Sequence, residues 1–342
     1  MPEASIIFLS YNQAEYVADA LVSALDQASA DFEIIVADDG STDSTLEVIN
    51  EVLRNHPKAY LVKYLPNQTN QGVVKNWNRA IEAATGKIII AQAGDDISRP
   101  DRVAVTLKRF HEFPSLMALF SQVDVINEKG VIIRKGFERG RPVFTMHQYT
   151  GGIDGFDFWK GAPVLGASGS YRMTLARQFD PLQHALSEDQ PYVYRALLLG
   201  AVGFEPNQLV QWRWHGLNLS IGGLFDENEG YESLRKRARM YYARHEAANQ
   251  YQADVRHAFR CGMIDSIRFN REMLRIRAIK AIEKLGQLSV DPSADMRDWA
   301  RSAIDVIRYN RLSWRTIGYV ARNFIKRNLP LYLKLKATRP LR

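Results

Sequence analysis

The chain has 342 residues, of which 46% are hydrophobic and 24% are charged, a composition typical of soluble globular proteins. Its formal net charge of +7 is divided unevenly, because residues 1–230 carry 20 Lys and Arg against 28 Asp and Glu, whereas residues 231–342 carry 25 against 10. The single cysteine, Cys261, excludes an internal disulfide, and the apolar runs are too short to predict a signal peptide or a membrane-spanning helix.

Strands and helices are expected to alternate over the first hundred residues. Short apolar or β-branched runs predict strands over residues 5–9, 32–37, 59–65 and 88–91. Apolar residues recur at helical spacing over residues 17–25, 46–53 and 77–84, and a further helix is expected to open at residues 98–101. This alternation favours a mostly parallel sheet with helices on both faces.

The pattern changes after this helix. The elements expected next are, in order, a β-hairpin over residues 117–133 with its turn at 127–130, a long aperiodic segment over 136–170, a helix over 187–199, a strand over 210–215, and helices from residue 231 onward with one interruption at 286–292. Long aperiodic segments in compact domains are often functional, so the segment over residues 136–170 is a candidate for substrate selection.

Two pairs of adjacent carboxylates, Asp38–Asp39 and Asp95–Asp96, follow buried strands. The carboxyl ends of parallel strands form the ligand-binding edge of open α/β sheets. Because we expect the two strands to be neighbours, both pairs should line one crevice. Adjacent carboxylates repel each other, and a divalent cation that carries a phosphate would satisfy them. The alternative for Asp95 and Asp96 is a structural role as caps of the following helix.

A set of motifs resembles the family-2 glycosyltransferases of GT-A fold. They are Ser10-Tyr11-Asn12, Asp38-Asp39-Gly40-Ser41-Thr42-Asp43, Asn70-Gln71-Gly72 with Asn78, Gly94-Asp95-Asp96 with Pro100-Asp101-Arg102, Glu188-Asp189, and Arg213-Trp214-His215 with Asn218 and Ser220. The resemblance covers residues 4–225. It implies an α/β catalytic domain over residues 1–228, with a Rossmann-like mixed sheet and helices on both faces, followed by a basic α-helical region over residues 229–342.

The resemblance also implies inverting transfer of a sugar from a nucleotide-diphosphate sugar, with UDP or dTDP as the carrier. Asp39 stands at the position that contacts the base in relatives. The other nucleotide-binding residues that it implies are Ser10, Tyr11, Asn12, Glu15, Asn78 and Asp95. Asp96 is implied to hold Mn²⁺ or Mg²⁺ against the diphosphate, although this chain has Ala93 where the commonest motif has a further Asp.

Asp189 matches the general base of the family, which takes a proton from the acceptor hydroxyl. Gly169 and Glu188 are expected on the acceptor side, and Arg213 and His215 are expected to close over the diphosphate or to complete the metal site. Structural alternatives exist, because a helix dipole favours acids in the first turn and a single histidine on a strand commonly has only a structural role.

The last thirty residues contain an amphipathic basic segment. Its apolar face comprises Trp314, Ile317, Val320, Ala321, Phe324 and Ile325, with arginines and lysines interspersed. This pattern is typical of a helix that lies in the interface of an anionic membrane. The alternative is a helix packed on the catalytic domain with a solvated basic face. No nucleic-acid motif is recognisable, so nucleic acid is not an expected partner.

These features predict a cytoplasmic, metal-dependent enzyme at the inner membrane that glycosylates a saccharide or a lipid-linked saccharide in cell-surface polysaccharide synthesis. Two alternatives stay open. A sugar nucleotidyltransferase should carry a basic Gly-rich loop after the first strand, where this chain has Ser10-Tyr11-Asn12-Gln13. A non-catalytic partner would bind saccharide or nucleotide without turnover.

Overall fold

The computed structural model describes residues 1–29, 31–137, 148–149, 165–184, 187–215, 231–290 and 295–310. The contacts divide the chain into two compact units, Met1–Leu217 and Asn218–Arg342. The expected domain boundary at residue 228 lies outside the described residues and stays a prediction.

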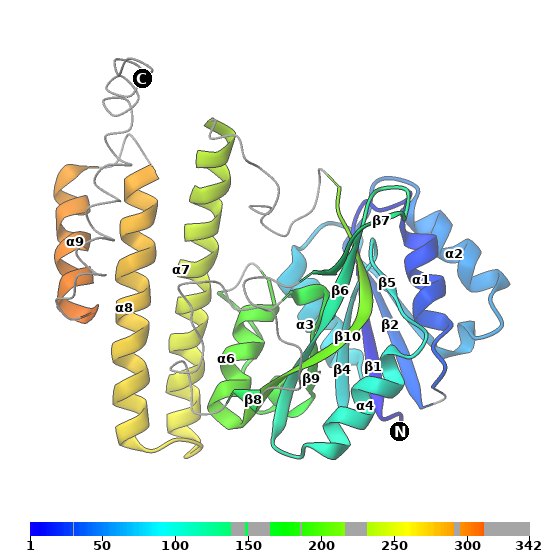
Figure 1. The fold of residues 1–342 in the computed structure, drawn as a ribbon, viewed down its shortest axis with the longest axis horizontal. Helices are drawn as coiled ribbons and strands as arrows, with labels where there is room; N and C mark the ends of the chain where they lie inside the picture. Colours follow the sequence, from blue (N-terminus) through cyan, green and yellow to red (C-terminus); the bar gives the residue numbers. More distant parts are fainter. Residues whose placement is uncertain are drawn as a thin grey trace. The chain divides into compact units, whose positions relative to one another are not determined.

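The first unit is built on one mixed sheet (Figure 1). Its strands are β1 (Ala4–Ser10), β2 (Phe32–Asp38), β3 (Val62–Pro66), β4 (Ile88–Ala93), β5 (Ile97–Ser98), β6 (Leu116–Ile126), β7 (Ile132–Phe137), β8 (Gln148–Tyr149), β9 (Ser170–Arg172) and β10 (Ala201–Arg213). Among the described residues the order is β3-β2-β1-β4-β9-β6-β10-β5, with β7 paired to β6 and β8 to β10. The first four strands of this order are parallel, whereas β9 is antiparallel to both β4 and β6. The mixed α/β sheet is therefore confirmed.

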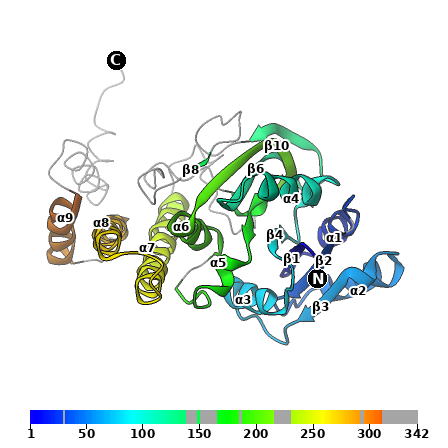
Figure 2. The ribbon, with the colours of Figure 1, turned by 90° about the horizontal axis from the view of Figure 1, so that it is seen from below.

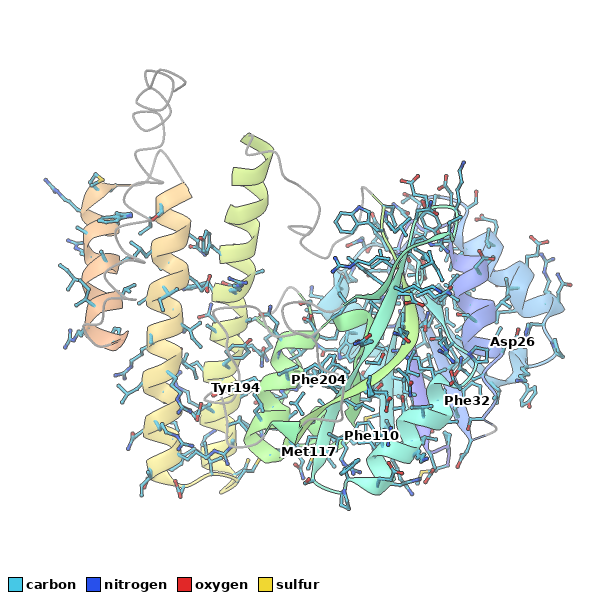
Figure 3. The ribbon with its side chains drawn as sticks, in the orientation of Figure 1. Asp26, Phe32, Phe110, Met117, Tyr194 and Phe204 are labelled. Carbon is cyan, nitrogen blue, oxygen red and sulfur yellow. The ribbon has the colours of Figure 1, made fainter. Side chains whose placement is uncertain are left out.

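Helices cover both faces of the sheet, as the two views in Figures 1 and 2 show. They are α1 (Val17–Leu25), α2 (Thr45–Asn55), α3 (Val73–Ala83), α4 (Arg102–Glu112), α5 (Thr174–Arg177) and α6 (Asp189–Leu199), with short 3₁₀ turns η1 (Ala59–Leu61) and η3 (Gly166–Ser168). Alternate residues of β1 point to opposite faces, so Phe8 joins the core with α1, α2 and α4, and Ile7 joins the core with α3 and α6. Figure 3 labels Phe32 and Phe110 in the former core and Phe204 in the latter.

Three expected elements differ from the structure. Residues 59–61 form η1, so β3 begins only at Val62. Ile97–Ser98 pair with β10 as β5, and α4 therefore begins later than expected, at Arg102, with Asp101 as its N-cap residue. Strand β10 starts nine residues before the expected position 210, because register shifts in its pairing with β6 interrupt the alternation on which the sequence interpretation relied.

The expected hairpin is confirmed. Strands β6 and β7 pair antiparallel around a turn in which Asn127 Oδ1 accepts the N–H groups of Lys129 and Val131, both at 3.0 Å. Gly130 has a φ of +76°, a left-handed conformation that glycine adopts without a Cβ penalty.

The second unit consists, in its described part, of α7 (Tyr231–Arg260), α8 (Ser266–Val290) and α9 (Met296–Asn310), and α8 contacts both of the others. The expected interruption over residues 286–292 starts later than predicted, because α8 continues to Val290, and a further break at residues 261–265 separates α7 from α8. Gly286 lies at a close contact of α8 with α7, since a Cβ there would lie 2.3 Å from the ring of Tyr241.

The expected interfacial segment, residues 314–325, lies outside the described residues. Within the described ranges, no helix is both long enough and apolar enough to cross a bilayer.

Candidate active site

Strand β1 lies between the two strands that end in acid pairs. The expectation that β2 and β4 are neighbours is wrong, since each pairs with β1 and not with the other. The two acidic turns nevertheless flank one point, because Asp39 N–H donates to Ser10 O at 2.9 Å and Gly94 N–H donates to Leu9 O at 2.8 Å. Both pairs therefore lie at the carboxyl edge of the sheet.

The loops after β1 and β2 are tied together by short polar side chains. Ser10 Oγ donates to Asp38 Oδ2 at 2.8 Å, and the N–H of Ser41 donates to Asp38 Oδ1 at 2.8 Å. Asn12 accepts the N–H of Thr42 at 2.8 Å and has a left-handed backbone, with φ of 51°. Ser10, Asn12 and Asp38 thus fix the conformation of the two loops beside Asp39.

The buried carboxylate of Asp39 organises the loop before α3. Its oxygens accept the Asn67 side-chain amide and the Gln71 N–H at 2.9 Å each, and the Gly72 N–H at 2.8 Å. An ionised carboxylate has about four lone-pair sites, so the N–H of a base could still be accepted. The role of Asp39 in base recognition stays a prediction.

A polar network behind Asp39 was not predicted. Asn76 donates to Ala37 O at 2.8 Å and accepts the side-chain amide of Asn67 at 3.2 Å. Arg79 also donates to Asn67 Oδ1 and to Leu65 O. Asn76 is a buried polar side chain beside Trp77 and Ala80. Its position on the apolar side of helix α3 could have indicated from the sequence that it has a buried hydrogen-bonding role.

Asp95 and Asp96 lie in the turn after β4, with exposed fractions of 8% and 2%. Asp96 Oδ1 accepts the backbone N–H of Arg213 at 2.9 Å, and Asp95 Oδ2 lies 2.9 Å from His215 Nε2. Burial and the neighbouring Asp95 charge raise the pKa of Asp96 well above its ordinary value, although the N–H of Arg213 and the Arg102 and Arg213 charges oppose the shift. This turn therefore concentrates negative charge that a bound cation would stabilise.

Arg213 and His215 are brought to these acids by β10. Arg213 Nε donates to Asp95 O at 2.8 Å, and its Nη1 donates to two backbone carbonyls of the β6–β7 turn, Asn127 O at 3.2 Å and Glu128 O at 2.8 Å. The strand ends at Arg213, so the predicted extension of this strand to His215 is wrong. Tyr16 unites the two instead: its ring stacks on His215 at 5.1 Å and lies 4.8 Å from the Arg213 guanidinium carbon.

A buried arginine, Arg102, holds the acidic turn in place through hydrogen bonds. Arg102 donates to Gln92 Oε1 at 3.1 Å and to Ala167 O at 3.0 Å, and Gln92 in turn donates to Asp96 O at 2.7 Å. Burial lowers the pKa of Arg102 to about 10, which leaves the guanidinium charged at neutral pH. Arg102 thus links β4, α4 and η3. Nothing in the sequence had indicated that Gln92 and Tyr16 themselves belong to the site.

Asp189 is the first residue of α6. Its Oδ1 accepts the Ser187 hydroxyl at 2.7 Å and the Gln190 N–H at 2.8 Å. The η3 turn lies close to it, since a Cβ on Gly166 would be 3.3 Å from Asp189 Oδ2. Burial, followed by the Asp189 charge, raises the pKa of the neighbouring Glu188 to about 7.

Gly169 joins this region to the acidic turn. Its carbonyl accepts the N–H of Ala91 in β4 at 2.9 Å, and a Cβ at this position would lie 2.3 Å from the Tyr171 hydroxyl. The hydroxyl of Tyr171 is buried and has no hydrogen-bond partner among the described residues. Burial and the Glu188 and Asp189 charges raise the pKa of Tyr171 well above its ordinary value, so the phenol stays protonated.

The predicted site residues therefore fall into groups. Ser10, Asn12 and Asp39 share the β1–β2 edge, and Asp95, Asp96, Arg213 and His215 form one connected cluster. Asn78 stands apart, because its side chain exchanges hydrogen bonds with the backbone of Leu182 at 2.8 and 3.2 Å. Tyr11 and Glu15 have exposed side chains. The roles assigned to these residues stay predictions.

A divalent metal fits the acidic cluster only with few protein ligands. The described residues contain no group of three or more His, Cys, Asp or Glu arranged to hold a metal ion. The two buried adjacent carboxylates nevertheless supply oxygens of the kind that Mn²⁺ and Mg²⁺ bind, and the His215 imidazole lies 2.9 Å from one of them, Asp95 Oδ2. Asp96, with Asp95 beside it, would hold such an ion, and phosphate oxygens and water would complete its coordination.

The architecture is that of the GT-A fold. The structure aligns with a crystal structure of S. aureus TarS residues 1–349 at a TM-score of 0.58 and 17% identity, over 100% of this chain and 93% of that chain. It aligns with the mannosyltransferase PcManGT of Pyrobaculum calidifontis, solved with GDP-Man and Mn²⁺, at a TM-score of 0.50 and 15% identity, over 96% and 86% of the two chains.

The sequence identifies the family. Residues 5–178, just over half of the chain, match the family described as Glycosyl transferase family 2, and the chain therefore belongs to glycosyltransferase family 2. Chondroitin synthase of Pasteurella multocida is 34% identical over 137 residues, which are 40% of this chain and 14% of that enzyme. The resemblance inferred from the motifs is thus confirmed, and the chain matches only a small part of this relative.

Proposed function

We propose that this glycosyltransferase moves a sugar, with inversion, from a UDP- or dTDP-linked donor to a hydroxyl of a saccharide or lipid-linked saccharide. The observation that carries the proposal is the buried pair Asp95–Asp96, contacted by Arg213 and His215 beside the end of β1. In such a cluster Arg213 can neutralise part of the diphosphate charge, and the two carboxylates can neutralise the charge of a metal ion. Neighbours of the same fold were solved with UDP-GlcNAc and with GDP-Man, which supports a nucleotide-sugar donor.

The proposed roles follow from the hydrogen-bonding capacity of each residue. Asp39 accepts an N–H of the base, the rim of Ser10, Tyr11 and Asn12 lines the base pocket, and Asp95 accepts a ribose hydroxyl. When bound at Asp96, Mn²⁺ or Mg²⁺ supplies positive charge to the leaving diphosphate. Arg213, whose guanidinium is held over Tyr16, adds charge on the same side.

Asp189 is proposed as the base that takes the proton of the acceptor hydroxyl. Inversion requires attack from the side opposite the leaving diphosphate, and a carboxylate on that side can accept the proton as the new bond forms. Ser187 and the Gln190 N–H orient Oδ1. The other oxygen, Oδ2, lies on the side of Gly166 and is the proposed proton acceptor.

The acceptor is proposed to be a growing saccharide of a polysaccharide pathway. The Pasteurella relative, named chondroitin synthase, supports this proposal, because its name describes polysaccharide synthesis by that protein. We propose the cytoplasm as the site of action, with the acceptor presented at the inner membrane. A single cysteine is compatible with a reducing compartment.

The test is Asp189→Asn, compared with Asp180→Asn at an exposed position of the same unit. Asp189→Asn should lower the rate of sugar transfer at least about 100-fold, since general-base catalysis contributes about 10²- to 10⁴-fold. Binding of the nucleotide with Mn²⁺ should change less than about twofold, and Asp180→Asn should leave both properties unchanged. Full transfer by Asp189→Asn would refute the assignment of the base.

A further inference from the structure

A groove runs between α7 and α8 in the helical unit. Its volume is about 470 Å³, and α7 contributes one arginine to it while α8 contributes the rest. The lining residues are Arg256, Phe269, Asn270, Met273, Leu274 and Arg277. This lining contains no carboxylate, so its polar character is cationic and its remaining surface is mainly apolar.

Large apolar side chains are exposed beside the groove. Leu274 is 55% exposed and Ile267, two turns earlier on α8, is 78% exposed. On α7, Phe259 is 41% exposed and stacks on Phe269 with ring centroids 4.5 Å apart. Exposed apolar side chains that gather beside one groove mark a contact surface, whereas scattered ones do not. We call Phe259, Ile267 and Leu274 the apolar rim.

The arginines of the groove lack the partners that other arginines of this unit have. Arg275 binds Glu272 at 2.7 Å, and Arg301 binds Asp298 at 3.4 Å. Neither Arg256 nor Arg277 makes a hydrogen bond or an ion pair with a described residue. Arg256 also lies close enough to Lys280 that its charge, after burial, lowers the pKa of that lysine. No acid among the described residues pairs with the positive charge of Arg256 and Arg277, which therefore favours an anion.

We propose that the groove and its apolar rim attach the protein to a bilayer that contains anionic lipids. A headgroup phosphate would lie between Arg256 and Arg277, which could each donate several N–H groups, and the apolar rim would enter the boundary between headgroups and acyl chains. A soluble anion would use the arginines but would leave the three rim side chains in water. Charge and exposed apolar surface on one face therefore fit a membrane better than a dissolved phosphate.

This site is separate from the segment over residues 314–325, and it does not depend on the transferase activity. Either property can fail while the other holds. Membrane binding is measured without donor or acceptor, whereas turnover on a water-soluble acceptor is measured without vesicles.

The test is co-sedimentation of the full chain with phosphatidylcholine vesicles, with and without 30% phosphatidylglycerol. Arg256→Gln combined with Arg277→Gln removes two charges from the groove. Arg297→Gln combined with Arg301→Gln removes two charges from exposed positions of α9 and is the matched control. Ile267→Gln combined with Leu274→Gln keeps the charge and removes apolar rim side chains. All six positions carry exposed side chains, so each variant should keep the helical circular dichroism of the parent.

We expect binding to the anionic vesicles and not to the neutral ones. The groove variant should bind roughly 30-fold more weakly, because it loses the attraction of two cations to the anionic surface. The control should change less than about threefold. The rim variant should also weaken binding about tenfold or more. Equal losses in the groove variant and its control, unchanged binding by the rim variant, or binding of soluble inorganic phosphate without binding of vesicles would each overturn the proposal.

Discussion

Gly169 shows how a single residue without a side chain can position the site. Its backbone carbonyl is hydrogen-bonded to Ala91 in β4, and the buried ring of Tyr171 occupies the space that a Cβ would need. The same glycine therefore sets the distance between the η3 turn, which lies beside Asp189, and strand β4, which leads into the turn of Asp95 and Asp96. Any larger residue must displace the ring or the turn.

Gly169→Ala should destabilise the first unit by about 1–3 kcal/mol, as overpacking of a close-packed site does. Tyr171→Phe removes the nearest atom, the hydroxyl at 2.3 Å, and this hydroxyl is buried without a described partner. Tyr171→Phe alone should therefore cost little, and the double variant should recover part of the loss. Urea midpoints of the four proteins measure this cycle. Additive losses would show that the hydroxyl does not limit the space.

The sequence was informative for residues whose chemistry is local. Asp39, Asp95 and Asp96 could be assigned to one edge because each follows a strongly apolar run, and the structure has them there. Tyr16 and Gln92 could not be assigned, because they act through partners that the fold brings together from distant segments. Tyr16 contacts a residue 199 positions away in the sequence, His215. Neither residue carries a charge or a motif of its own.

At the scale of elements, the same limit appears in β10. Short buried strands such as β1 and β4 could be predicted because uninterrupted apolar runs have few other fates. Strand β10 spans Ala201–Arg213 and contains two register shifts around Gln208, which break the alternation of its side chains. Its first five residues are all buried and therefore show no alternation that a sequence pattern could detect, although this strand carries Arg213 to the acidic turn.

Helix α8 contains a buried acid that should make its stability depend on pH. Glu283 is 7% exposed, one of its oxygens has no described partner, and burial raises its pKa to about 7. Between pH 4.5 and pH 7 the unfolded chain releases this proton while the folded chain keeps it. The contribution to stability is therefore lost as the pH rises through this window, by up to about 3 kcal/mol.

Glu283→Gln should consequently stabilise the helical unit at pH 7.5 and have little effect at pH 5. Circular dichroism at 222 nm during urea unfolding of the full chain measures the difference. Asp298→Asn, at an exposed position of α9, is the control and should show no such dependence on pH. A difference between Glu283→Gln and the parent that is the same at both pH values would contradict the shifted pKa.

At the scale of the whole molecule, acidic and basic residues concentrate in different units, for which different functions are proposed. The described part of the first unit places four buried acids, Asp38, Asp39, Asp95 and Asp96, at one sheet edge, where a nucleotide and a cation are proposed to bind. The helical unit carries the two arginines of its groove, which pair with no acid in the part of the chain that the structure describes. Residues 231–342 hold 25 of the 45 Lys and Arg residues, so this division was already visible in the sequence. The surface that uses the charge could not be read from composition, because it depends on how α7 packs against α8.

The acidic turn is proposed to bind a nucleotide through a metal ion. Thermal unfolding of the full chain with UDP, TDP, GDP, CDP or ADP, each with and without Mn²⁺, tests it most directly, with Asp96→Asn measured in parallel. At a ligand concentration of about 100 Kd, binding stabilises the native state by about 2.7 kcal/mol, and the unfolding temperature should rise by about 5–10 °C. We predict this rise with UDP or TDP only when Mn²⁺ is present, and its loss in Asp96→Asn. An unfolding temperature that no nucleotide changes, with or without Mn²⁺, would contradict the account.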